Sequence, residues 1–133
     1  MKVVVDTNVL VSGVFFGGMP SRVLDAWRDG RVNLVASPDI VEEYRRVGEQ
    51  LAAQFPGVSL APLLALLVMT AEIIEPPGLP EQVSRDPDED KFIACALAGD
   101  CQFIISGDKD LLEVSGYQGV KIVAPREFLE SVL

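Results

Sequence analysis

Two aspartates follow apolar, strand-like segments in this chain, and the sequence contains no histidine. Asp6 comes directly after residues 3–5, and Asp108 comes shortly after residues 103–105. Catalytic groups of parallel α/β sheets collect in the crevice at the carboxyl ends of the strands. If the two segments are neighbouring strands, both carboxylates face one crevice. Carboxylates without histidine favour a hard, oxygen-preferring cation such as Mg²⁺ or Mn²⁺.

Strand-like and helix-like segments alternate along the chain, which is typical of α/β proteins. The first valine run is apolar on both faces, as expected for a central parallel strand. We therefore predict a three-layer α/β fold with a mostly parallel central sheet flanked by helices, in a single domain spanning residues 1–133. The glycines at 13, 17 and 18 predict a loop after the first strand. The expected strands are residues 2–5, 32–36, 73–74, 103–106 and 120–123. The expected helices are residues 20–30, 38–54, 59–71 and 87–98, a short helix around residues 111–112 and a terminal helix from residue 125 onward.

Composition limits the functional classes. The 133 residues include 49 % hydrophobic side chains, which indicates a globular chain with a sizeable core. The formal net charge is −9, from 11 basic and 20 acidic residues. This balance argues against a broad basic surface for nucleic acid. It leaves nucleic-acid chemistry open, because bound divalent ions reverse the local charge, and it favours a basic protein partner.

Cysteine usage and hydropathy indicate a cytoplasmic protein outside the membrane. Cys95 and Cys101 form no C-x-x-C pair and have no histidine to complete a zinc set. Two isolated thiols fit a reducing compartment. The start of the chain lacks the pattern of a signal peptide. The longest apolar stretch, residues 60–74, is shorter than the ~20 residues that span a bilayer.

Two neighbouring glutamates on the helix from residue 38 differ in the face they occupy. At about 100° per residue, Glu42 lies opposite the apolar stripe. It can pair with Arg45 and Arg46 three and four residues further on. Glu43 lies at the edge of the stripe, where a carboxylate is unfavourable unless it is paired or bound to metal. We therefore select Glu43 as the functional acid of this helix.

Four acids occur among residues 86–90. Helix capping explains most of them, with Asp86 as N-cap, proline as the first helical residue and Glu89 as the capping-box partner. Asp88 gains from the helix dipole. Asp90 is left over, on the same face as apolar neighbours further along the helix. We select Asp90 as the functional acid of this cluster.

The acids after the strand at 103–106 also divide by position. Asp108 lies nearer the end of the strand and is the better metal-ligand candidate. Asp110 could be a helix cap, a supporting residue or a ligand of a second metal ion.

With these four acids in place, the chain resembles the PIN-domain family of metal-dependent ribonucleases over essentially its whole length. The resemblance rests on four blocks in order: residues 3–10 around Asp6, residues 37–43 ending at Glu43, residues 86–93 around Asp90 and residues 106–112 around Asp108. It implies a parallel sheet with flanking helices, and it places the family's four acids on these positions, with Asn8 and Ser106 as supports. The third and fourth blocks resemble the bacterial branch that is labelled as toxin components of toxin–antitoxin pairs.

Hydrolysis of an RNA phosphodiester bond requires an activated water and a stabilised leaving oxygen, and Mg²⁺ or Mn²⁺ can provide both. Asp6 would be the central ligand, with Asp90 and Asp108 completing the set directly or through water, and Glu43 as a ligand or as the group that orients water. The resemblance also implies an antitoxin protein as partner, and together with the apolar helix at 59–71 it favours a homodimer. Candidate contacts to the RNA backbone are Arg22, Arg85, Lys91 and Lys109.

Two alternatives remain open. One is another metal-dependent phosphohydrolase, such as a phosphatase with a strand-end aspartate as nucleophile. Such enzymes commonly place a second acid two residues later, where this chain has Asn8. The other is a PIN-fold binding module with little or no catalytic activity.

Overall fold

The computed structural model describes residues 1–133, and its core is a five-stranded sheet in which every strand pair is parallel. The strand order is β3-β2-β1-β4-β5. This confirms the predicted α/β class, and the sheet is fully parallel. The strands are β1 (Lys2–Val5), β2 (Asn33–Ala36), β3 (Glu72–Ile73), β4 (Phe103–Ile105) and β5 (Lys121–Val123).

The register of the three strands β1, β4 and β5 brings their carboxyl ends to one level. Val5 pairs with Ile105, and Ile105 pairs with Val123. The ladder continues one step past the strand ends, because the Asp6 amide donates to the Ile105 carbonyl at 3.0 Å and the Ser106 amide donates to the Val123 carbonyl at 2.9 Å. Asp6 and Ser106 therefore leave the sheet side by side.

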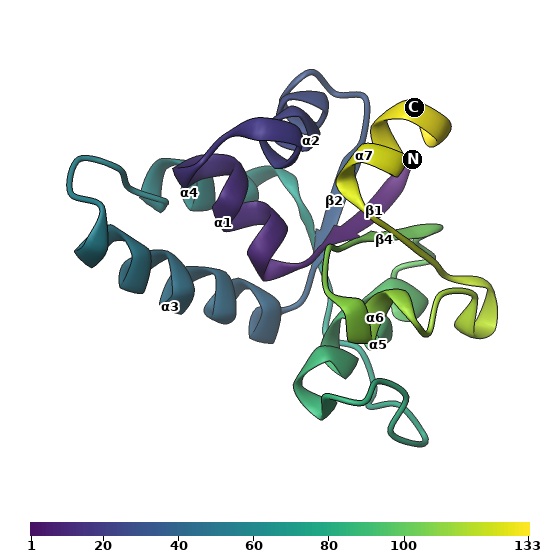
Figure 1. The fold of residues 1–133 in the computed structure, drawn as a ribbon. Coiled ribbons are helices and arrows are strands. Elements are labelled where there is room, and N and C mark those ends of the chain that lie inside the picture. The colour runs from purple at the N-terminus through teal and green to yellow at the C-terminus, as the bar shows by residue number, and fades with distance from the viewer.

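Helices cover both faces of the sheet (Figure 1). Helix α5 packs on β1, β2 and β4, while α1, α2 and α7 gather on the other side and α3 extends away from the end of β2. No helix combines the length and the apolar character needed to cross a membrane. The helices are α1 (Thr7–Phe15), α2 (Gly18–Arg28), α3 (Pro38–Gln54), α4 (Ala61–Thr70), α5 (Asp90–Ala98), α6 (Lys109–Leu112) and α7 (Pro125–Glu127), with short 3₁₀ turns at Pro87–Glu89 and Tyr117–Gly119 and a π-helical turn at Phe128–Val132.

Helix α3 shows how sequence signals and packing agree. The hydroxyl of Ser37 caps its start by accepting from the Ile40 amide at 3.2 Å. Ile40, Tyr44 and Gly48 form its buried stripe. A Cβ atom at Gly48 would lie 2.5 Å from Leu60 Cδ2, so glycine there permits the close approach of the segment that leads into α4.

The prediction of a loop after β1 is wrong, because Thr7–Phe15 form helix α1. The Asp6 carboxylate starts this helix by accepting from the Val9 amide at 2.8 Å. Gly13 lies inside α1, where a Cβ atom would come within 2.7 Å of Leu24 Cδ1 on α2. This glycine reflects close packing between two helices, a requirement that a local sequence pattern does not distinguish from a turn.

Candidate active site

Asp6 is buried at the end of β1, with only 3 % of its surface exposed. One carboxylate oxygen accepts from the Val9 amide, and the other accepts from the hydroxyl of Ser106. The Ser106 oxygen in turn accepts from the Asp108 amide at 2.9 Å. Ser106 therefore connects the loop of Asp108 to Asp6, at the position where the sequence predicted a supporting residue.

Burial raises the pKa of Asp6 to about 6. The hydrogen bonds from Ser106 and Val9 lower this pKa, but they do not compensate for the loss of water around the carboxylate. The negative charges of Asp108 and Glu43 raise it further. Asp6 is thus a desolvated acid with other acids close by, an environment typical of functional sites.

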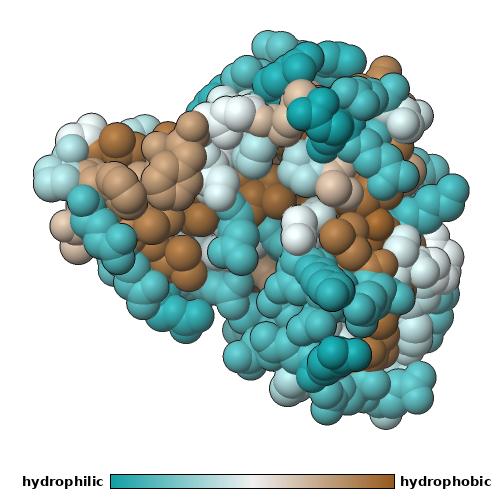
Figure 2. Space-filling model, in the orientation of Figure 1, coloured by the Kyte–Doolittle hydropathy of each residue, from teal (hydrophilic) through white to brown (hydrophobic).

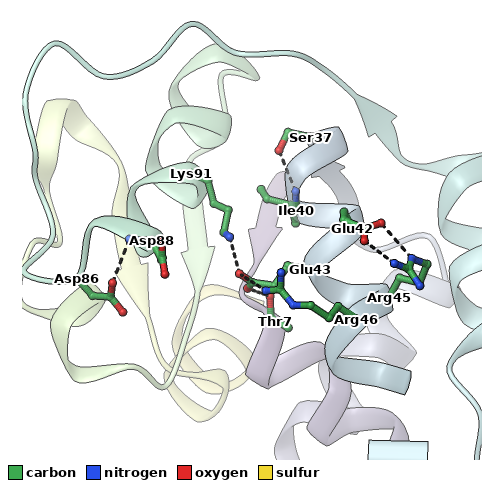
Figure 3. A network of polar contacts seen from close by, with 10 residues as sticks. All are labelled: Thr7, Ser37, Ile40, Glu42, Glu43, Arg45, Arg46, Asp86, Asp88 and Lys91. Atoms are coloured by element: carbon green, nitrogen blue, oxygen red, sulfur yellow. Dashed lines mark hydrogen bonds and ion pairs between the residues drawn. The ribbon is translucent and has the colours of Figure 1, made fainter. Parts of the chain in front are cut away.

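Glu43 faces the same region from α3. The adjacent residue Tyr44 is buried and donates its hydroxyl to the Val5 carbonyl, which fixes α3 against the end of β1. Glu43 accepts from the Thr7 hydroxyl and forms ion pairs with Lys91 and, at 3.8 Å, with Arg46 (Figure 3).

Glu42 behaves as the helix-face reasoning predicted. It is exposed and pairs with Arg45 on the outer side of α3, whereas Arg46, the other predicted partner, pairs with Glu43 (Figure 3). The structure therefore places Glu43, and not Glu42, beside the end of β1.

The turn before α5 corrects the interpretation of Glu89. Asp86 is the N-cap, as predicted, and accepts from the Asp88 amide at 3.0 Å. Glu89 makes no capping-box hydrogen bond back to Asp86. Residues 87–89 form a 3₁₀ turn, whose rotation per residue differs from that of an α-helix, so an α-helical pattern misplaces residue 89.

Glu89 instead lines a cavity of about 230 Å³ together with Asp6, Thr7 and Glu43. Burial raises its pKa to about 8, and the charges of Asp108 and Asp6 contribute to the increase. Sequence reasoning missed this residue because a capping box accounted for it. Only its position next to Asp90 in the acidic cluster could have drawn attention to it.

Asp90 has a structural role that the sequence did not predict. Its carboxylate accepts from the Val83 amide at 3.0 Å and from the Ser84 amide at 2.8 Å, and so holds the loop that precedes the acidic turn. It lines a different hollow, shared with Lys91 and the residues of the 75–82 loop. A carboxylate has about four lone-pair sites, so these two hydrogen bonds leave Asp90 able to accept more.

Asp108 lies in the loop after β4, and its negative charge acts on both Asp6 and Glu89. It is the N-cap of α6 and accepts from the Asp110 amide at 2.8 Å. Asp110 therefore lies in the first turn of α6 and is not its cap. Asn8, at the start of α1, is exposed, and its side chain has no hydrogen-bond partner within the protein.

The four predicted RNA contacts differ in their availability. Lys91 is engaged by Glu43. Arg85 lies 3.8 Å from Glu113, and Arg22 interacts with the Met19 sulfur at 3.8 Å, both at exposed positions. Lys109 is exposed without an ion pair. Arg46, which the sequence did not single out, lines the cavity of Asp6 and Glu43.

The donor set matches a hard divalent cation, because every acid in the crevice offers carboxylate oxygen and neither histidine nor cysteine lies among them. No three acidic side chains converge closely enough to form a ready metal-binding group. Glu43 faces Lys91 and Arg46 instead. The chemistry of the donors fits Mg²⁺ or Mn²⁺, and the present side-chain positions do not define a coordination geometry.

The protein is a parallel α/β protein with acidic side chains gathered past the carboxyl ends of its strands. A family model described as PIN domain matches residues 2–110, and the chain belongs to the PIN-domain family. PIN domains are typically nucleases and generally use divalent metal ions. A comparison with curated proteins gave no match.

Proposed function

We propose that the protein is a Mg²⁺- or Mn²⁺-dependent endoribonuclease that hydrolyses RNA phosphodiester bonds, with residues 1–133 acting as one nuclease domain. The observation that carries this proposal is the desolvated carboxylate of Asp6, whose pKa is raised to about 6, next to the charges of Asp108 and Glu43. Acids forced together in this way are stabilised by a divalent cation, which a phosphodiester substrate also requires.

Asp6 and Asp108 are the proposed central ligands, with Glu43, Asp90 and Glu89 as further carboxylates. The ion, when bound, lowers the pKa of a coordinated water and neutralises the charge that develops on the phosphate. Ser106 keeps Asp6 oriented through its hydrogen bond. Asn8 and Asp110 are proposed as supporting residues.

Glu43 differs from the other acids of the proposed site, because two basic side chains form ion pairs with it. Lys91 and Arg46 both pair with Glu43, and the Thr7 hydroxyl fixes one of its oxygens. These contacts hold the Glu43 carboxylate at the wall of the cavity that Asp6 also lines. A carboxylate at this position can accept a proton from an attacking water. The proposed main role of Lys91 is therefore its ion pair with Glu43, and contact with RNA is secondary. Arg22, Arg85 and Lys109 stay available as proposed contacts to the RNA backbone.

Titration with Mn²⁺ by calorimetry tests the metal site and separates the two neighbouring acids of the 86–90 cluster. We expect binding near neutral pH in the wild type and a reduction of affinity by about tenfold in Glu89→Gln, because a carboxylate that can lose its proton to a bound metal ion is replaced by a neutral amide. In Asp90→Asn we expect weaker Mn²⁺ binding together with lower thermal stability, since one acceptor for Val83 or Ser84 is also lost.

The outcomes of this titration are distinct. Absence of measurable Mn²⁺ binding by the wild type would sink the nuclease proposal. If Asp90→Asn loses Mn²⁺ affinity at unchanged thermal stability while Glu89→Gln binds Mn²⁺ as tightly as the wild type, Asp90 is the metal ligand and Glu89 is not. Loss in both variants would place both carboxylates at the ion.

We propose further that the enzyme is the toxin of a toxin–antitoxin pair that acts in the cytoplasm. The resemblance of the third and fourth sequence blocks supports this role, and the net charge of −9 favours a basic segment of the antitoxin. The free, buried thiols of Cys95 and Cys101 fit a reducing compartment. A small open reading frame beside the gene, whose product binds this protein, is the expected finding.

A homodimer is the proposed assembly, with α4 as its interface. Helix α4 buries only Leu63 and Leu67, and it exposes Leu66, Val68 and Met69. Met69 is 84 % exposed. Figure 2 shows apolar surface on the side of the molecule where α4 lies in Figure 1. A contiguous apolar surface of this kind marks an interaction site.

Replacing Met69 with lysine is expected to shift the protein from dimer to monomer, because an ammonium group would be buried without a partner in the interface. Light scattering coupled to size-exclusion chromatography measures the mass. Gln102→Lys adds the same charge at an exposed position outside α4 and should leave the dimer intact. A monomeric wild type, or a dimer that survives Met69→Lys, would contradict the α4 interface.

A further inference from the structure

A second hollow of about 450 Å³ lies beside the acidic crevice. Its walls come from the start of α1, the first turn of α2, the loop after β4 and the turn after β5. Asn8 lines both this hollow and the cavity of Asp6, and Asp108 stands on its inner wall. A ligand seated there would therefore lie next to the proposed cleavage site.

The charge of this hollow differs from that of the crevice. Arg126 and Asp108 are its only charged residues, whereas the crevice gathers Asp6, Glu43 and Glu89. Arg126 is exposed and lies 3.3 Å from Glu130 in an ion pair open to solvent. Such a pair contributes little stability, so Arg126 can exchange Glu130 for a phosphate of a substrate.

The remaining walls combine flat apolar surface with unused polar groups. Met19, Pro20 and Pro125 supply apolar side chains. The amide of Asn8 and the hydroxyl of Ser12 have no hydrogen-bond partner within the protein, and both residues lie on α1 four positions apart, so they share one face of the helix. Apolar surface with a few free donors and acceptors is the composition of a small-ligand site.

We propose that this hollow holds the nucleotide next to the cleaved phosphodiester bond, an inference that rests on the proposed nuclease function. The base packs against Met19, Pro20 and Pro125, and Asn8 and Ser12 hydrogen-bond to the base or the ribose. Arg126 binds the next phosphate along the strand. Because a duplex would keep the base stacked and paired, this seat selects single-stranded RNA.

Two measurements test the subsite, and the first of them does not depend on catalysis. The first is amide chemical shifts in ¹⁵N-labelled protein, with adenosine 5′-monophosphate and inorganic phosphate as probes. We expect the monophosphate to shift the amides of Asn8, Ser12 and Gly107 as well as Arg126, and phosphate alone to affect only the surroundings of Arg126. Equal shifts with phosphate would reduce the site to an anion site and overturn the proposal, as would the absence of shifts with the nucleotide.

The second measurement is the kinetics of cleavage of single-stranded RNA in Mn²⁺. Arg126→Ala is expected to raise KM about tenfold, the size of one charge-assisted contact, with kcat within about twofold. Glu130→Gln is the matched control, because it removes the ion-pair partner and keeps Arg126. An unchanged KM in Arg126→Ala, or an equal increase in Glu130→Gln, would overturn the role of Arg126.

Gly107 offers a way to fill the hollow without strain. A Cβ atom at this position meets no other atom within 4 Å, and the backbone does not adopt a positive φ. Gly107→Leu should abolish the nucleotide-induced shifts and raise KM, while Mn²⁺ affinity stays within about twofold. Retained shifts in Gly107→Leu would place the nucleotide elsewhere. If the protein cleaves no RNA but the shifts occur as expected, the nuclease proposal fails and nucleotide binding stands.

Discussion

Asp6→Asn is expected to lower the rate of Mn²⁺-dependent cleavage of single-stranded RNA by about a thousandfold, because the central carboxylate ligand loses its charge and metal catalysis contributes several kcal/mol. Asparagine has nearly the same shape as aspartate. Its side-chain oxygen can still accept from Ser106 or Val9, so the fold should persist. Cleavage of a labelled oligonucleotide and far-ultraviolet circular dichroism are the two measurements.

Asp25→Asn is the matched control for this substitution. Asp25 is exposed on α2 and pairs with Arg28 at 3.6 Å, so the same chemical change occurs away from the crevice. We expect its cleavage rate to stay within about twofold of the wild type. Unchanged cleavage in Asp6→Asn would mean that a contaminating nuclease or a different site performs the reaction.

Asp6→Asn should also stabilise the protein against unfolding when divalent ions are absent. Folding raises the pKa of Asp6 from 3.8 to about 6, so above pH 7 the buried charge lowers the unfolding free energy by about 3 kcal/mol. The variant loses one hydrogen-bond acceptor, which offsets about 1 kcal/mol. We expect Asp6→Asn to be more stable than the wild type by about 2 kcal/mol in metal-free buffer, measured by urea denaturation.

The pH dependence of this difference has a defined sign. The folded state binds the Asp6 proton more tightly than the unfolded state, so the contribution of Asp6 is fully favourable below about pH 4 and is lost as pH rises through 6. The advantage of Asp6→Asn should therefore appear between pH 4 and 7. Mn²⁺ should raise the midpoint of thermal unfolding in the wild type and leave the variant nearly unchanged. A difference that is flat with pH would contradict the raised pKa.

Much of the fold followed from local signals. The valine run before Asp6 predicted the central parallel strand, and Ser37 with the following proline predicted the start of α3. Helix α1 escaped prediction because its interior glycine at position 13 packs against Leu24 of α2, a contact that no local sequence pattern shows. Close approach between two helices and a flexible turn produce the same amino acid, and sequence does not distinguish them.

The candidate site divides in a similar way. The face of α3 separated Glu43 from Glu42, because helical periodicity determines which side of a helix a residue occupies. In the acidic turn, residues 86–90, helical periodicity and capping did not predict where the side chains of Glu89 and Asp90 lie. There a 3₁₀ turn brings Glu89 to the cavity of Asp6, and Asp90 holds the backbone amides of Val83 and Ser84.

The sequence by itself determined that the aspartates at positions 6 and 108 follow strand-like segments, because buried strands are expressed as apolar runs, and only the pairing of β1 with β4 brought them to one edge of the sheet. The sequence also determined that oxygen ligands alone would be available there. Only the tertiary structure decided which charges meet. The ion pair of Lys91 with Glu43, the raised pKa of Glu89 and the link from Ser106 to Asp6 all join residues of different elements. Their partners depend on distances across the fold, and no spacing along the chain encodes those distances.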